Sequence, residues 1–167
     1  FWLSDQASAV VDRQPDAVSE AIARCVVFKA DVVAQDKTES RGVRECLNYG
    51  HTLAHAIEKL SGYGTYSHGH AVAEGMRFAA RMGMRLADMP AELAQAQAQL
   101  LDDLDLPELD WEASPAQVLD VMKRDKKARR GQVRFVCLQD VGQWQLQDVA
   151  DGVILEELEA YFAQKRR

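Results

Sequence analysis

The chain has 167 residues, 47% of them hydrophobic, and a formal net charge of -6 at pH 7. This length and composition favour one domain with a hydrophobic core, and the acidic balance argues against general binding to nucleic acid or anionic membranes. No run approaches the roughly 18 to 20 apolar residues that span a bilayer. Cys25, Cys46 and Cys137 are too few and too widely spaced for a disulfide framework or a thiolate zinc site, so we expect a cytoplasmic protein.

Taken in chain order, the elements are mostly helical. The opening residues, Phe1 and Trp2, are apolar and not preceded by Met, so we expect a piece of a longer protein. Residues 15–36 begin with proline at a first-turn position and repeat apolar residues at three- and four-residue steps, which predicts a helix. Alternation with a period near two predicts one β-hairpin over about residues 132–148. The helical pattern recurs over residues 42–60, 69–88, 91–104, 115–124 and 152–165. The predicted fold is therefore a single, mainly α domain: a helical bundle with one small hairpin.

All four histidines lie within residues 51–70, and two of them share a face of the helix predicted over residues 42–60. At 100° per residue, one arc of that helix carries Arg44, Asn48, His51, His55 and Glu58. A solvated stripe is the simplest interpretation of such an arc, but solvent faces are usually built from Glu and Lys. Two imidazoles one turn apart could instead share a ligand or metal, and His68 and His70 could return to the same place after the turn at 61–67.

Gly50 lies inside this predicted helix. A glycine there costs about 1 kcal/mol of helix propensity relative to alanine, which suggests that a backbone or a ligand approaches closely at this point.

A second feature is a basic run in an otherwise acidic chain. Residues 123–130, with the sequence KRDKKARR, contain six basic side chains out of eight. A solvated loop is one interpretation. If the loop folds over the histidine face, its lysines would form an anion site suited to a phosphorylated or carboxylated small molecule.

Four segments together resemble a known family. They are KADVVAQD at 29–36, RECLNYGHTLAHAIE at 44–58, GYGTYSHGHAVAEGM at 62–76 and MKRDKK at 122–127. The string L-N-x-G-H-T-x-x-H-A-x-E, followed about ten residues later by H-G-x-A-V, is much more specific than a lone histidine pair. On these motifs the chain resembles the C-terminal domain of 3-dehydroquinate synthase.

The resemblance implies a two-domain enzyme of the shikimate pathway, in which an NAD-binding domain precedes a helical, metal-binding domain. Such an enzyme converts 3-deoxy-D-arabino-heptulosonate 7-phosphate into 3-dehydroquinate and phosphate, using NAD and a divalent ion, zinc or cobalt. Its partners would be the sugar-phosphate substrate and the chain's own N-terminal domain, and family members are commonly homodimers. The NAD-binding domain is absent from these 167 residues, so we expect the chain alone to be inactive.

The resemblance also implies roles for single residues. His51 and His68 match the two histidine metal ligands. Asn48 and His55 match positions near the substrate phosphate, where His55 could also relay protons. The remaining matches are Arg44 to the residue that holds the substrate carboxylate, Lys29 to a catalytic lysine at the same end of the substrate, and Lys126 or Lys127 to a phosphate contact.

Three departures from the family pattern qualify these roles. The stretch at 36–44 is one residue longer than usual, which would change the register between Lys29 and Arg44. His70 stands where an acid is common, and we interpret it as a surface residue, with a spare metal ligand as the alternative. The glutamate that completes the metal site in the family precedes residue 1, so we expect metal to be weakly held or missing.

Two alternative functions remain open from the sequence. Sister sugar-phosphate cyclases use the same scaffold to make cyclitols. From a different class, the chain could be a stand-alone helical metal-binding or regulatory module.

Overall fold

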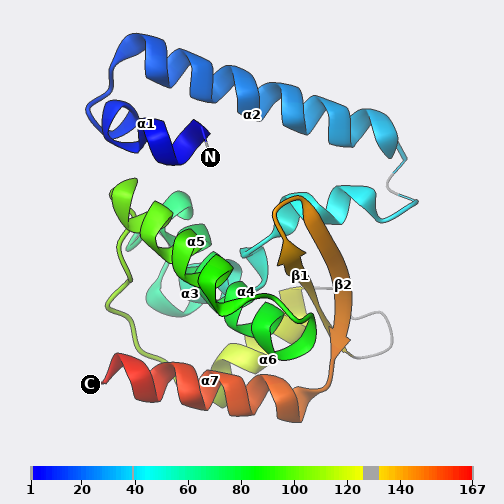
Figure 1. Ribbon diagram of the computed structural model, residues 1–167. Helices are drawn as coiled ribbons and strands as arrows, with labels where there is room; N and C mark the ends of the chain where they lie inside the picture. The colour runs from blue at the N-terminus through cyan, green and yellow to red at the C-terminus, as the bar shows by residue number, and fades with distance from the viewer. Residues whose placement is uncertain (1, 39, 126–131, 167) are drawn as a thin grey trace.

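A computed structural model describes residues 2–38, 40–125 and 132–166, with the side chain of Asp125 excepted. A helical body carries one two-stranded sheet, and a pair of helices, α1 and α2, lies along one side of that body (Figure 1). The mainly α fold with one small hairpin is thereby confirmed. The elements are α1 (Trp2–Val11), α2 (Pro15–Gln35), the 3-10 helix η1 (Val43–Asn48), α3 (His51–Ser61), α4 (His68–Leu86), α5 (Ala91–Asp103), α6 (Pro115–Asp125), β1 (Val133–Asp140), β2 (Gln143–Val149) and α7 (Asp151–Lys165).

Helix α4 is the centre of the body. It packs against α3, α5, α7 and β1, and its buried face includes Phe78, which is fully inaccessible to solvent. The ring centroid of Phe78 lies 6.2 Å from that of Phe135 on β1 and 5.5 Å from that of Tyr161 on α7. Because each fully buried side chain of this size contributes about 1.5–3 kcal/mol, this cluster is a main source of the stability of the body.

The hairpin closes one side of the core. Strands β1 and β2 pair antiparallel, with Arg134 opposite Asp148 and Phe135 opposite Gln147. The turn between them contains Gly142 at φ 75°, a backbone conformation that glycine adopts without a steric penalty. The described strands begin and end within one residue of the predicted hairpin bounds. Because β1 contacts η1 and α4, the hairpin supports both elements.

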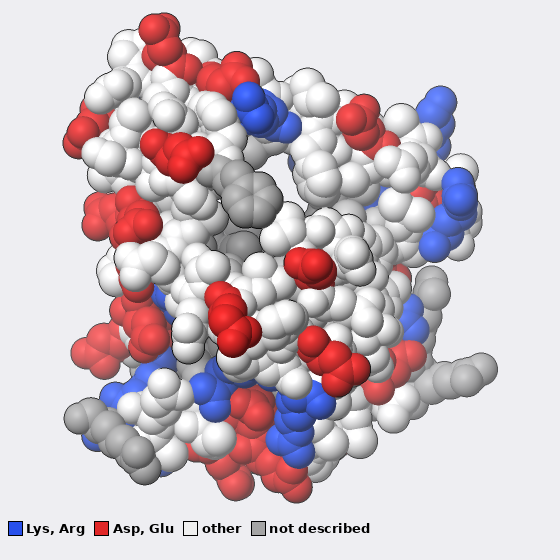
Figure 2. All heavy atoms as spheres, viewed as in Figure 1, with Lys and Arg blue, Asp and Glu red and all other residues white. Residues whose placement is uncertain are grey.

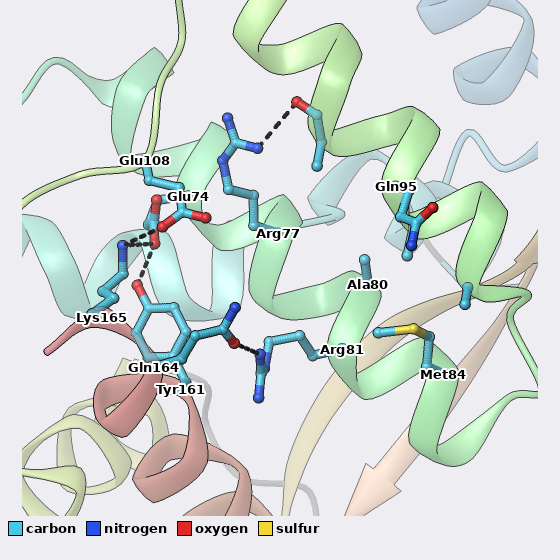
Figure 3. Close-up of a pocket in the computed structure, with 13 residues that line it drawn as sticks. Glu74, Arg77, Ala80, Arg81, Met84, Gln95, Glu108, Tyr161, Gln164 and Lys165 are labelled. Carbon is cyan, nitrogen blue, oxygen red and sulfur yellow. Dashed lines mark hydrogen bonds and ion pairs between the residues drawn. The ribbon is translucent and has the colours of Figure 1, made fainter. Parts of the chain in front are cut away.

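A buried polar network joins α4 to α7 (Figure 3). The Glu74 carboxylate is fully buried; it accepts hydrogen bonds from the hydroxyl of Tyr161 and, at 3.0 Å, from the backbone N–H of Leu109. The ammonium group of Lys165 lies 2.8 Å from the same carboxylate, and the Trp111 indole donates to the Tyr161 hydroxyl at 2.8 Å. Burial, together with the Glu74 charge, raises the pKa of Tyr161, so this phenol stays a hydrogen-bond donor.

The predicted helix over residues 42–60 is wrong as a single element. The chain forms the 3-10 helix η1 and the α-helix α3, separated at Tyr49 and Gly50, and Gly50 has a left-handed φ of 82°. A Cβ atom on Gly50 would lie 2.8 Å from the carbonyl oxygen of Val72, and one on Gly75 would lie 2.0 Å from the carbonyl oxygen of Gly50. The close approach expected at Gly50 therefore exists, and the approaching group is the backbone of α4.

Helix α2 is exposed along its middle. Ala17 and Val32 are its buried residues, and residues 22–31 between them are exposed. Four large apolar side chains in this segment are more than half exposed: Ile22 (58%), Val26 (61%), Val27 (59%) and Phe28 (61%). A helix with apolar residues on several sides is typical of one that is covered by other protein.

The other helices agree with the sequence-based expectations within two residues at each end, except α1. The chain from Trp2 to Val11 forms a helix that the periodicity did not predict, because only Ala7 of this helix is buried and its apolar stripe is weak. Among the described residues, none of the helices combines the length and apolar character needed to cross a bilayer.

The close approach of Gly75 to the backbone of Gly50 leads to a testable prediction. Replacing Gly75 with Ala should lower the free energy of unfolding by about 3 kcal/mol or more, because the added methyl group overlaps the backbone of Gly50 and one of the two helices must move. Urea denaturation would measure the change. Gly152→Ala in α7 is the matched control, since a Cβ there meets nothing within 4 Å. It should leave stability unchanged or raise it, and equal losses in both variants would contradict the prediction.

Candidate active site

The loop between α2 and η1 is organised by one carboxylate, that of Asp36. This side chain is 2% exposed, and its Oδ1 accepts hydrogen bonds from the backbone N–H groups of Ser40 (3.0 Å) and Arg41 (3.1 Å). Its Oδ2 accepts from the N–H of Val43 at 3.0 Å. Burial on its own would raise the pKa of this carboxyl, but the backbone N–H donors outweigh it and lower the pKa. Asp36 therefore stays ionised and fixes the chain that leads into η1.

A pocket of about 430 Å³ opens beside this loop. Lys29 comes to it from α2, Arg44 and Asn48 from η1, and His51 from the start of α3. The structure thus brings together four of the predicted site residues, and the extra residue between positions 36 and 44 does not keep Lys29 and Arg44 apart. The acids of the pocket are engaged elsewhere: Asp36 with the backbone, and Glu45 with Arg134 at 3.5 Å.

The imidazoles of His51 and His68 lie side by side, with ring centroids 5.3 Å apart, as the returning turn predicted. His51 begins α3 and His68 begins α4, so the two rings come from the N-terminal ends of adjacent helices. The Nδ1 atom of His51 lies 3.3 Å from the backbone carbonyl oxygen of Tyr49, and that of His68 lies 3.0 Å from a carboxylate oxygen of Glu58. The Nδ1 atoms of both rings therefore face oxygen acceptors.

His55 continues the row one turn further along α3. Its ring centroid lies 5.7 Å from that of His51. It lines a second, adjoining hollow of about 340 Å³ together with Glu58, Lys59 and Arg124, the last from the end of α6. Tyr63 and Val121 complete the lining. The beginning of the basic run therefore reaches the histidine face.

His70 has a local role apart from this arrangement. The Nδ1 atom of His70 is 2.6 Å from the hydroxyl of Ser67, whose oxygen also accepts from the His70 backbone N–H and caps α4. His70 is thus part of a helix cap, the kind of local role expected of a surface residue. Lys126 and Lys127 lie outside the described residues.

The imidazoles of His51 and His68 are suitable ligands for zinc or cobalt, but two ligands are fewer than a catalytic metal site needs. Imidazole nitrogens suit both metals, and an ion bound at about 2.0–2.1 Å from a nitrogen of each ring needs rings about as close as these. A catalytic zinc site has three protein ligands. Within the part of the chain that the structure describes, no group of three or more His, Cys, Asp and Glu side chains is placed to hold a metal. His51 and His68 therefore fit as part of a site that another ligand would complete.

The cavity of Figure 3 is a poorer candidate. It measures about 280 Å³ and is bordered by α4, α5 and α7. Its cations are already paired with acids: Arg77 with Asp102 at 2.8 Å, Arg81 with Glu157 at 2.6 Å, and Lys165 with Glu74. Figure 2 likewise shows acids and bases interspersed over this face of the molecule. An added anion would have to compete with these partners.

The comparisons with known proteins agree with the motif resemblance. A family model described as 3-dehydroquinate synthase C-terminal matches residues 1–128. Curated 3-dehydroquinate synthases include that of Rhodopirellula baltica, 41% identical over 84% of this chain and 38% of the relative. That of Acidithiobacillus ferrooxidans is 41% identical over 96% of this chain and 44% of the relative. That of Nitrosococcus oceani is 43% identical over 93% of this chain and 43% of the relative. The chain thus spans less than half the length of these relatives.

Solved structures resemble the fold closely. A 2-deoxy-scyllo-inosose synthase, complexed with carbaglucose-6-phosphate, NAD+ and Co2+, has a TM-score of 0.72 and 27% identity, over 86% of this chain and 41% of its own. ValA, a 2-epi-5-epi-valiolone synthase from Streptomyces hygroscopicus with NAD+ and Zn2+ bound, has a TM-score of 0.81 over 98% of this chain and 46% of its own. Because its sequence identity is 18%, this likeness shows the fold alone. With the family model covering most of its residues, this chain belongs to the 3-dehydroquinate synthase C-terminal family.

Proposed function

We propose that the chain is the C-terminal domain of an enzyme that converts 3-deoxy-D-arabino-heptulosonate 7-phosphate into 3-dehydroquinate and phosphate. The observation that carries the proposal is the pocket shared by Lys29, Arg44, Asn48 and His51, with His68 beside it. Groups suited to a carboxylate, a phosphate and a metal thus meet in one place. Curated relatives at 41–43% identity carry the name of this enzyme.

Each side chain has a role that its chemistry supports. Bound NAD and a divalent ion would supply the transient oxidation of the substrate and the polarisation of its hydroxyl group. Arg44 would hold the substrate carboxylate, because a guanidinium matches a carboxylate with two parallel hydrogen bonds. Lys29, which comes to the pocket from α2, would contact the same end of the substrate.

The other end of the substrate would lie toward α6. Asn48 and His55 would donate to the phosphate, and His55 could also hold a proton of the reaction on its ring. Arg124 lines the His55 hollow, and Lys126 and Lys127 follow it in the sequence by two and three residues. This proximity in the sequence supports a phosphate contact by Lys126 or Lys127.

The NAD-binding part would come from a domain upstream of Phe1. Two observations support this. The relatives are more than twice as long as the part that this chain matches, and α2, which carries Lys29 of the candidate pocket, exposes four large apolar side chains in its middle. A domain that covered α2 would remove this apolar surface from water and would stand next to Lys29. It could also provide the missing metal ligand.

A second candidate function is the cyclisation of another sugar phosphate. The 27% identity to a 2-deoxy-scyllo-inosose synthase supports the scaffold that the sugar-phosphate cyclases share, but it does not favour one substrate. Arg44 favours a substrate with a carboxylate, and the more similar curated relatives are 3-dehydroquinate synthases. Turnover of substrates with and without a carboxylate by the complete enzyme would separate the two functions.

The two-domain proposal predicts that this chain alone folds but does not turn over substrate, because hydride transfer needs a nicotinamide held next to the reacting carbon. Dehydroquinate formation with NAD and zinc should be undetectable for the chain alone and should appear when the separately made upstream half is added. Turnover by the isolated chain would contradict the two-domain proposal. An associated pair that remains inactive would contradict the proposed reaction and favour a binding module.

The metal proposal predicts that His51→Ala and His68→Ala in the complete enzyme each abolish zinc binding measured by calorimetry, because one imidazole is left where two are needed. His70→Ala is the control, since its Nδ1 is engaged by Ser67 at the cap of α4. It should leave zinc binding unchanged. Equal losses in all three variants would indicate diffuse binding by surface imidazoles.

The phosphate proposal predicts that Lys126→Ala or Lys127→Ala in the complete enzyme weakens phosphate-bearing ligands by about 1.5–3 kcal/mol, the range of a hydrogen bond to a charged group. Arg129→Ala and Arg130→Ala should have smaller effects. Ligand titration would measure the affinities and thermal unfolding would check the fold. Similar losses in all four variants would point to diffuse attraction by a solvated loop.

A further inference from the structure

We infer that Glu58 is a positioning residue that holds the His68 imidazole in the tautomer and orientation needed to bind metal through Nε2. The inference rests on the proposed metal role of His68 and goes beyond it. Its basis is the contact of 3.0 Å between a carboxylate oxygen of Glu58 and Nδ1 of His68.

The contact joins two helices across a turn. Glu58 lies in the last turn of α3 and its side chain is 18% exposed, whereas His68 is the first residue of α4 and its side chain is 56% exposed. The connecting turn contains Gly62 and Gly64 with φ of 84° and 94°, so the chain reverses sharply between the two residues. The better buried carboxylate is therefore the fixed partner, and the exposed imidazole is the group that it restrains.

The acceptor determines which ring nitrogen carries the proton. An ionised carboxylate only accepts hydrogen bonds, so Nδ1 of His68 must carry the hydrogen in this contact, and Nε2 of the neutral ring keeps its lone pair. The negative charge also makes the imidazole a stronger ligand. His51 shows the same arrangement with a backbone acceptor, the carbonyl oxygen of Tyr49. Both imidazoles thus have an oxygen partner behind the ring, which a pair of surface histidines does not need.

A purely structural role for Glu58 is the competing explanation. In that case the contact would only join α3 to α4. Exposed ion pairs contribute about 0–1 kcal/mol, so its removal would change stability little, and it would change neither the tautomer of His68 nor the metal affinity beyond that effect.

The first test needs no metal. Nitrogen-15 NMR of the metal-free chain at pH 8 reports which nitrogen of His68 carries the proton. We expect the Nδ1–H tautomer in the wild type and a change toward the Nε2–H tautomer in Glu58→Ala. Glu58→Gln should retain much of the Nδ1–H form, because its amide oxygen still accepts a hydrogen bond. Glu159→Ala, at an exposed site on α7, is the matched control. An unchanged tautomer in Glu58→Ala would overturn the inference.

The second test is zinc titration of the same variants made in the complete two-domain enzyme. Glu58→Ala should weaken binding about 10- to 100-fold, with Glu58→Gln intermediate and Glu159→Ala unchanged, while thermal unfolding stays close to wild type. If His51→Ala abolishes binding and Glu58→Ala leaves it unchanged, the inference fails and the proposed metal role survives. If wild-type binding is absent or survives His51→Ala, the proposed metal role fails, and with it the role of Glu58 as a positioning residue for metal.

Discussion

The backbone contact between Gly50 and Gly75 sets the geometry on which the rest of the site depends. A Cβ on Gly75 would come within 2.0 Å of the carbonyl oxygen of Gly50, so α3 and α4 approach more closely than side chains would permit. This approach fixes the beginning of α3, where His51 lies, against a helix whose first residue is His68. Because α4 is also packed against α5, α7 and β1, the position of the two imidazoles is tied to the whole core. A site on rigid elements keeps its ligands in place.

The two acids of the candidate pocket, Asp36 and Glu45, have partners of their own. Asp36 directs its negative charge to backbone N–H groups, and Glu45 lies near Arg134, which is also bound to Asp148 at 2.6 Å. A net charge of -6 is therefore compatible with an anion-binding pocket, since what matters for a small anion is the local field.

The sequence predicted the mainly α fold, the hairpin and most helices, because periodicity and proline positions act locally. It did not predict the division of residues 42–60, since two glycines far apart in the chain, Gly50 and Gly75, meet only in the folded protein. A continuous helix placed His51 and His55 correctly on one face, because both lie in α3, but Arg44 and Asn48 reach the pocket by a different route. The hydrogen bonds that Asp36 accepts from the loop had a local signal, a carboxylate followed by Ser40 and Arg41, that the periodicity did not include. The contact between Glu58 and His68 depends on the geometry of the turn between α3 and α4, which the sequence motifs do not specify.

The incomplete donor set has a thermodynamic consequence on the proposed assignment. If two imidazoles come from this chain and a further ligand comes from the upstream domain, each unit binds metal weakly and the assembled pair binds it well. Linkage then requires that metal tightens the association of the domains by the same factor by which association tightens metal binding. The exposed apolar middle of α2 would contribute to that association without metal, because its burial depends on area and not on coordination. Docking through α2 and completion of the metal site would therefore make separate contributions to the free energy of association. Lys29 connects the two regions, because it belongs to α2 and lines the candidate pocket.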